Sequence, residues 1–145
     1  MQRFASVKTA LGIAAMATML DTTAADLLVR VSGISTASGQ IGCALFKSAD
    51  GFPMNPAAAT QVWTEASTKG VECRFSALPA GDYAISVSHD LNANRSLDTN
   101  LFGVPTEAWG VSKNVRPLMR APQWKEATFE VADGKDLTLD IKISK

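Results

Sequence analysis

The 145 residues are enough for one domain with a single two-layer core and too few for two domains of ordinary size. Fourteen basic residues balance fourteen acidic ones, and the basic residues are scattered along the chain. The sequence therefore has neither the basic stripe of a nucleic-acid-binding protein nor the polybasic patch of a protein that docks on a membrane surface.

The first 25 residues have the pattern of a secretory signal peptide. Arg3 and Lys8 make a positive start, residues 9–20 form an apolar run, and small residues at 23–25 form a cleavage site. The apolar run is too short to span a bilayer, so we expect cleavage and no membrane insertion afterwards. The expected mature domain comprises residues 26–145 and is periplasmic or secreted.

The rest of the chain is a series of short β-type segments separated by turn signals, a pattern typical of an all-β sandwich. The first two segments are expected to pair as a hairpin. A short helix is expected at Pro56, with Asn55 as its N-cap. The region from Asp90 to about Pro122 has no clear period and forms one long Asn/Asp-rich loop. The segments, about seven strands in all, cover residues 27–34, 41–47, 61–66, 71–75, 83–88, 127–131 and 137–143.

Cys43 and Cys73 are the only two cysteines. In an oxidising compartment such a pair is most simply a disulfide. The alternative is two small buried apolar side chains, since free cysteine packs well in a core. A zinc site would need more soft ligands than these two cysteines and His89 can supply.

Side chains that carry oxygen stand at alternate positions in HDLNANRSLDTN, residues 89–100. Calcium prefers several hard oxygen ligands, which such a loop could converge on one point. The spacing matches the first three-quarters of a helix-loop-helix calcium loop. However, Arg95 replaces the glycine of the sharp turn and Leu101 replaces the closing glutamate. The predicted calcium ligands are Asp90, Asn92, Asn94, Ser96 and Asp98.

Further ligand candidates are Glu107, which could complete the site from later in the loop, and the neighbouring side chains of His89 and Asn100. The competing interpretation needs no ion, because Asn and Asp commonly stabilise turns through hydrogen bonds to nearby backbone amides. In that interpretation Arg95 could neutralise one of the loop acids.

An enzymatic function finds little support in the residue pattern. A glycosidase-type hydrolase would need two carboxylates across a cleft, a role that a pair such as Asp98 and Glu107 would have to take. His89 has no serine or cysteine partner in a nucleophile context. Among the tryptophans, Trp109 lies in the long loop and is the best candidate for a contact surface, while Trp63 and Trp124 are expected to be partly buried.

The chain resembles a bacterial secreted family known as domain of unknown function 2141. The similarity lies in a turn of the form LPAG-x-YA, a strand ending in His-Asp, an Asn-rich loop, a Gly-x-Pro-x-Glu-x-x-Gly-x-Ser tail and the later segment APQWKEATF. The chain departs from the family at Arg95, where glycine is usual, and at Val111, where a bulkier aromatic is usual. The matching residues are Leu78, Pro79, Gly81, Tyr83, Ala84, His89, Asp90, Asn92, Asn94, Leu97, Asp98, Asn100, Gly103, Pro105, Glu107, Gly110 and Ser112.

The resemblance implies an Ig-like or prealbumin-like antiparallel β-sandwich, similar to carboxypeptidase-regulatory-like domains, and it adds no catalytic residue. The expected function is a non-enzymatic binding or accessory module for an unknown protein, peptide or carbohydrate ligand. The expected functional surface is the loop from Asp90 to Ser112, stabilised by calcium in the sharpest form of the hypothesis. The alternatives are a structural cell-envelope protein without an ion site and a hydrolase that uses loop carboxylates. The residues indicate no oligomeric state.

Overall fold

The computed structural model describes residues 23–145. Most of the predicted signal peptide therefore lies outside the described residues. The first strand, β1, begins at Ala25, the last residue of that prediction, and Ala25 is buried. Within the described residues, no helix is long and apolar enough to cross a membrane.

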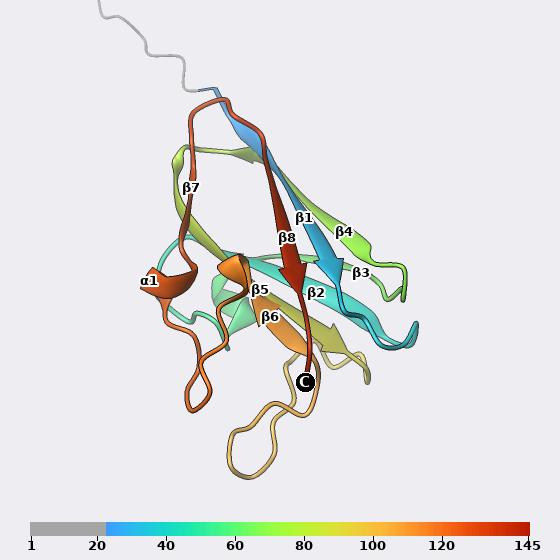
Figure 1. Cartoon of the computed structure of the whole chain (residues 1–145). Helices are drawn as coiled ribbons and strands as arrows, with labels where there is room; N and C mark the ends of the chain where they lie inside the picture. The colour runs from blue at the N-terminus through green and yellow to red at the C-terminus, as the bar shows by residue number, and fades with distance from the viewer. Residues whose placement is uncertain (1–22) are drawn as a thin grey trace, which may run out of the picture.

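The predicted all-β fold is confirmed, with eight strands in two packed sheets (Figure 1). One sheet has the order β4-β1-β8. The other has the order β3-β2-β5-β6, and β7 also pairs with β5. The strand that the sequence did not predict is β6, which has only three residues and therefore too few to show an alternating pattern. The strands are β1 Ala25–Ser32, β2 Gln40–Phe46, β3 Thr60–Glu65, β4 Val71–Leu78, β5 Gly81–Asp90, β6 Trp109–Val111, β7 Phe129–Val131 and β8 Leu137–Lys142.

The prediction that the first two segments pair as a hairpin is wrong. β1 pairs antiparallel with β4 and parallel with β8, whereas β2 pairs with β3 and β5 in the other sheet. The connection between β1 and β2 thus crosses from one sheet to the other. Apolar alternation shows which face of a strand is buried, but it does not identify the neighbouring strand. The parallel pairing of β1 with β8 also differs from a purely antiparallel sandwich.

The core lies between the two sheets and is made of the alternate, inward-facing residues of each strand. Examples are Val29 on β1, Ile85 on β5 and Ile141 on β8, all almost fully buried. The predicted disulfide is confirmed: Cys43 on β2 and Cys73 on β4 are bonded across this core, with their Cα atoms 6.5 Å apart. The covalent bond therefore joins one sheet to the other.

Within residues 23–145, three short helices lie outside the sheets. They are the 3-10 helices η1, Pro56–Ala58, and η2, Ser112–Asn114, and the α-helix α1, Trp124–Ala127. The predicted cap of η1 is confirmed, since the Asn55 side chain accepts a hydrogen bond from the Ala57 backbone amide. Trp124 of α1 packs with Phe52 over Ala84, so these residues cover one part of the outer face of the β3-β2-β5-β6 sheet. Next to this covered part, the loops 91–108 and 115–123 extend beyond the sheet (Figure 1).

Candidate functional site

The Asn/Asp-rich loop is organised around the carboxylate of Asp90, at the end of β5. The Asp90 side chain is fully buried. Its Oδ2 accepts a hydrogen bond from the Arg95 backbone amide at 2.7 Å, and its Oδ1 accepts one from the Asn94 amide at 3.3 Å. Both carboxylate oxygens are thus directed at the backbone of the loop that follows.

The carboxylate of Glu107, at the other end of the loop, also accepts hydrogen bonds from loop backbone amides. Its side chain is buried, and its Oε1 accepts a hydrogen bond from the Leu91 amide at 2.9 Å. Its Oε2 accepts one from the Asp98 amide at 3.1 Å. One carboxylate therefore joins the start of the loop to its middle.

Asp98 is held by two asparagine side chains. The Nδ2 groups of Asn92 and Asn94 donate to its carboxylate at 2.6 and 2.8 Å. The Oδ1 atoms of the same asparagines accept from the backbone amides of Asn94 and Ser96. Asn100 closes a further turn by accepting from the amides of Phe102 and Val104. These are the hydrogen bonds of Asx turns, which Asn and Asp form without an ion.

The predicted ligands are thus brought into one loop, but most of their side-chain oxygens accept hydrogen bonds from amides. No group of three or more His, Cys, Asp or Glu side chains among residues 23–145 is placed to hold a metal. His89 is buried, and its Nε2 lies 2.7 Å from the Ser38 carbonyl oxygen, to which it donates. The calcium site stays a prediction, and the loop has a complete structural explanation without it.

A second candidate site lies on the outer face of the β3-β2-β5-β6 sheet. The strand register places Trp63, Gly42, Ser88 and Trp109 in one row across the four strands. The next row consists of Gln61, Ala44, Ser86 and Val111. Small side chains on the two central strands thus form a floor, and larger ones on the two outer strands form walls. We call this feature the tryptophan groove, with Gly42, Ala44, Ser86 and Ser88 as its floor and Trp63 and Trp109 as its walls.

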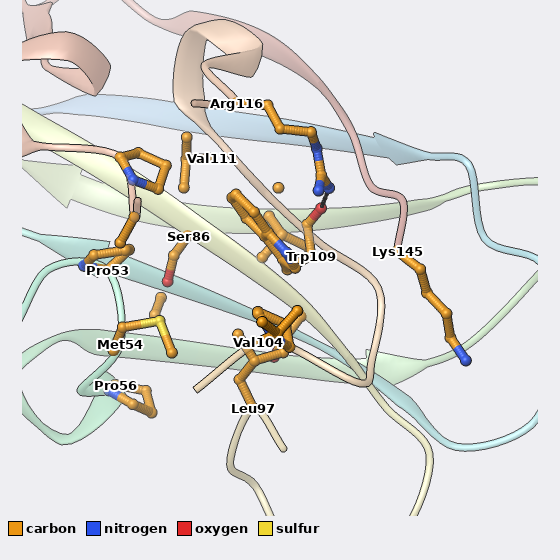
Figure 2. Close-up of a pocket in the computed structure, with 18 of the residues that line it drawn as sticks. Pro53, Met54, Pro56, Ser86, Leu97, Val104, Trp109, Val111, Arg116 and Lys145 are labelled. Atoms are coloured by element: carbon orange, nitrogen blue, oxygen red, sulfur yellow. Dashed lines mark hydrogen bonds between the residues drawn. The ribbon is translucent and has the colours of Figure 1, made fainter. Parts of the chain in front are cut away.

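The groove is a cavity of about 600 Å³, within the usual range for small-molecule sites. Neighbouring strands are about 4.8 Å apart, so the strands that carry the two tryptophans are separated by roughly 14 Å. Loops 91–108 and 115–123 and the segment before η1 complete its rim. Figure 2 shows Pro53 and Met54 on one side of Ser86, Trp109 on the other, and Leu97 and Val104 below.

The Trp63 side chain is held in place by specific contacts. The Trp63 indole Nε1 donates to Gln61 Oε1 at 3.1 Å, and Gln61 Nε2 donates to the Pro56 carbonyl at 2.8 Å. The Trp63 ring lies over Gly42, where a Cβ atom would come within 2.6 Å of two ring carbons. The glycine is therefore required for this ring position.

An arginine guanidinium lies over each tryptophan ring. The Arg95 Cζ is 5.5 Å from the Trp63 ring centroid, and the Arg116 Cζ is 4.0 Å from the Trp109 centroid. Arg116 Nη2 also donates to the carbonyls of Trp109 and Ser144, at 2.6 and 2.7 Å, the former drawn in Figure 2. Partial burial lowers the pKa of the Arg116 guanidinium from its usual value, although arginine remains charged at neutral pH.

Large apolar side chains on the two rim loops are exposed to solvent. Phe102 is 89% exposed on one loop, and Leu118 and Met119 are 97% and 96% exposed on the other. All three line the groove. Apolar groups gathered at the rim of a concavity are typical of a surface that is covered when a ligand or partner binds.

Of this second site, the sequence identified only Trp109 as a contact residue, and Trp63 was expected to be partly buried. The floor was missed. Its signal in the sequence is a pair of small residues at alternate, outward positions of two strands, at 42 and 44 and again at 86 and 88. That signal becomes readable only when the two strands are known to be neighbours in the same register.

A family model described as "Uncharacterized protein conserved in bacteria (DUF2141)" matches residues 29–139 of the chain. The match covers all strands except the first residues of β1 and the last residues of β8. No curated protein and no solved structure matches the chain. The comparisons thus give a family and no activity, so any function has to be argued from the site itself.

Proposed function

Because the chain belongs to the bacterial family known as domain of unknown function 2141, whose description assigns no activity, we propose a function from the geometry. The protein is a non-enzymatic binding module that takes up an apolar small molecule in the tryptophan groove. The observation that carries this proposal is the pair of cross-strand rows. Gly42 and Ser88 lie between Trp63 and Trp109 in one row, and Ala44 and Ser86 lie between Gln61 and Val111 in the next.

Outward positions in a solvated β-sheet are usually occupied by larger polar or β-branched side chains, which pack against their cross-strand neighbours. Here Gly42, Ala44, Ser86 and Ser88 leave that space open. Ser86 and Ser88 are only partly buried, so this part of the sheet face is open to solvent. Small side chains between two tryptophan walls leave a groove open on the sheet face, which favours a role in binding.

The chemistry of the lining favours an apolar ligand over a carbohydrate. A sugar would need several polar side chains free to bind its hydroxyl groups. Gln61, the amide-bearing side chain of the lining, is already bonded to Trp63 and Pro56. The lining also contains Ser86, Ser88 and four basic side chains, but most of its residues are apolar or aromatic, including leucine, methionine, valine, proline and tryptophan. Methionine in particular adapts to irregular apolar shapes.

The hydrogen bonds of the loop support binding rather than hydrolysis. A hydrolase of the kind considered from the sequence would use Asp98 and Glu107 as a carboxylate pair. Both are engaged in loop hydrogen bonds, and neither lines the tryptophan groove. Secretion or export to the periplasm remains part of the proposal and rests on the pattern of residues 1–25.

A neutral apolar fluorophore, N-phenyl-1-naphthylamine, provides the test. Its emission should rise on binding to the wild-type protein, and Ser86→Phe, which fills the floor, should weaken binding by more than about tenfold, equivalent to about 1.4 kcal/mol. The matched control is Ser76→Phe, at an exposed position of β4 in the other sheet, which should bind as the wild type does. Equal binding by the wild type and Ser86→Phe, or no binding at all, would contradict the proposal.

A further inference from the structure

Building on the proposed function, we infer that the ligand of the tryptophan groove is a single-chain amphiphile with an anionic head group. Its apolar chain lies along the floor between Trp63 and Trp109, and its head group is bound by the arginines at the walls. The carrying observation is the charge of the lining. Within residues 23–145, its charged side chains are those of Arg95, Arg116, Arg120 and Lys145, and no Asp or Glu side chain belongs to it.

This imbalance is local. The whole chain has as many acidic as basic residues, yet the charged side chains that the described chain contributes to the lining are all basic. Of the four basic residues, Arg120 is neutralised by Glu126, with Nη2 2.7 Å from Oε1. Lys145 extends away from Trp109, as Figure 2 shows. Arg95 and Arg116 therefore remain as the cations that a ligand in the groove can reach.

Both arginines have N–H groups to offer. The Arg95 side chain makes no hydrogen bond or ion pair in the described chain, and its Trp63 contact leaves its guanidinium donors free. Arg116 uses Nη2 for its two carbonyl acceptors, which leaves Nε and Nη1 without a partner among residues 23–145. A planar guanidinium matches carboxylate and phosphate oxygens in geometry as well as in charge.

The positions of these cations favour an amphiphile over a small polar anion. Each guanidinium lies over an indole ring, so an anion bound there is next to an extended apolar surface. A free inorganic anion would leave that surface exposed to water. A chain attached to the anion would cover the floor and the exposed Phe102, Leu118 and Met119 of the rim.

The test compares ligands with the same chain and different head groups, as competitors of bound N-phenyl-1-naphthylamine below their micelle concentrations and at pH 8. The ligands are dodecanoate, dodecyl phosphate, neutral dodecanol and cationic dodecyltrimethylammonium. At least one anion should compete about tenfold to a hundredfold better than dodecanol, the range expected for hydrogen bonds to a charged group. The better of the two anions identifies the head group. The cation should compete worst.

In the variant Arg95→Gln/Arg116→Gln, the anion should compete with the fluorophore no better than dodecanol does, and dodecanol itself should still compete. The matched control, Arg30→Gln/Arg74→Gln, removes two arginines from the other sheet, where both lie beside Glu72, and should retain the preference. Because Arg116 also binds two carbonyls, the single variant Arg95→Gln is tested as well. It breaks no hydrogen bond or ion pair of the described chain, loses only the contact with the Trp63 ring, and should show part of the loss.

Two results would overturn the proposal of an anionic head group while leaving the apolar groove intact. Dodecanol could compete as well as both anions, or Arg95→Gln/Arg116→Gln could still prefer the anion over dodecanol. If the protein binds the fluorophore but none of the four ligands displaces it, the proposal of an amphiphilic ligand is wrong. Absence of fluorophore binding would instead count against the proposed function.

Discussion

A single buried carboxylate, that of Asp90, sets the backbone course of the loop that begins beside it. Its two oxygens bind the amides of Asn94 and Arg95, and Arg95 adopts a φ of 58°, in the left-handed region that favours glycine. The resemblance to domain of unknown function 2141 implies glycine at this position. The observed conformation accounts for that preference, and Arg95 adopts it despite its side chain.

Replacing this carboxylate should destabilise the protein. In Asp90→Asn, one acceptor oxygen becomes a donor facing a backbone amide inside the fold, so we expect a loss of about 1–3 kcal/mol in the free energy of unfolding. Denaturant unfolding measures it. The matched control is Asp133→Asn at an exposed turn position, which should stay within about 0.5 kcal/mol of the wild type. Equal stability of Asp90→Asn and the control would contradict the role given to this carboxylate.

Gly42 is the residue on which the position of Trp63 depends. A Cβ atom at this position would lie 2.6 Å from the ring, so Gly42→Ala should displace the indole and cost about 1–3 kcal/mol of stability. The same substitution in a Trp63→Ala background should cost much less, because the ring that it meets is gone. This double-mutant cycle isolates the contact. An equal cost in both backgrounds would show that Gly42 is needed for another reason.

At the scale of elements, loop 91–108 is a self-contained structure of Asx turns closed by Asp90 and Glu107. Its alternating oxygens suggested a calcium loop because the same residue types serve both purposes. The sequence could not decide between the two, since the direction of each oxygen depends on backbone angles. In the structure these oxygens face amides of the loop itself.

Thermal melts in excess chelator and in millimolar calcium separate the two interpretations of this loop. We expect superimposable melts, because the hydrogen bonds already satisfy the side-chain oxygens. An ion that binds only the folded state at a hundredfold excess over its dissociation constant would add about 2.7 kcal/mol and shift the midpoint by several degrees. A rise specific to calcium over magnesium, and lost in Asp90→Ala, would contradict the ion-free interpretation.

The second rim loop, 115–123, is fastened to α1 by the Arg120–Glu126 pair and by the Gln123 amide, which donates to Glu126 Oε2 at 2.8 Å. The hydrogen bond from Arg120, assisted by that amide, lowers the pKa of Glu126 from 4.5 to about 2. A carboxylate with a lowered pKa in the folded state contributes stability above its unfolded pKa, and this contribution is lost as the pH falls towards the folded value.

The stability difference between the wild type and Glu126→Gln should therefore be constant above about pH 5.5 and shrink between 4.5 and about 2. Urea unfolding at a series of pH values measures this difference. Glu130→Gln, on β7 and without an ion pair in the described chain, is the control for removing one carboxylate. A difference that grows as the pH falls would contradict the stabilising role of the pair.

At the scale of the whole molecule, the parts that could be predicted from the sequence are those that depend on a local pattern. Seven of the eight strands, the helix capped by Asn55 and the disulfide have such a pattern in periodicity, capping residue or cysteine count. The pairing of β1 with β4 and β8, instead of β2, depends on long-range packing that no local pattern encodes.

The tryptophan groove belongs to the same class of long-range features. It combines residues from β3, β2, β5 and β6 with loops on both sides, and each strand contributes only two or three of them. A tryptophan in a sequence is more often a buried or anchoring side chain than a binding wall. Trp63 and Trp109 can be recognised as walls of a groove only from the strand register, which places Gly42 and Ser88 between their indoles.

The most direct test of the central claim, that the tryptophan groove binds an apolar ligand, is the NMR spectrum of the three indole N–H groups during titration with neutral decanol. Trp63 and Trp109 line the groove, whereas Trp124 of α1 packs against Phe52, does not line the groove and serves as an internal control. We predict saturable shifts of the Trp63 and Trp109 signals with the Trp124 signal unchanged, together with shifts of the Gly42, Ala44, Ser86 and Ser88 amides. Shifts confined to Trp124, or spread over β1, β4 and β8 with the groove signals unchanged, would contradict the account.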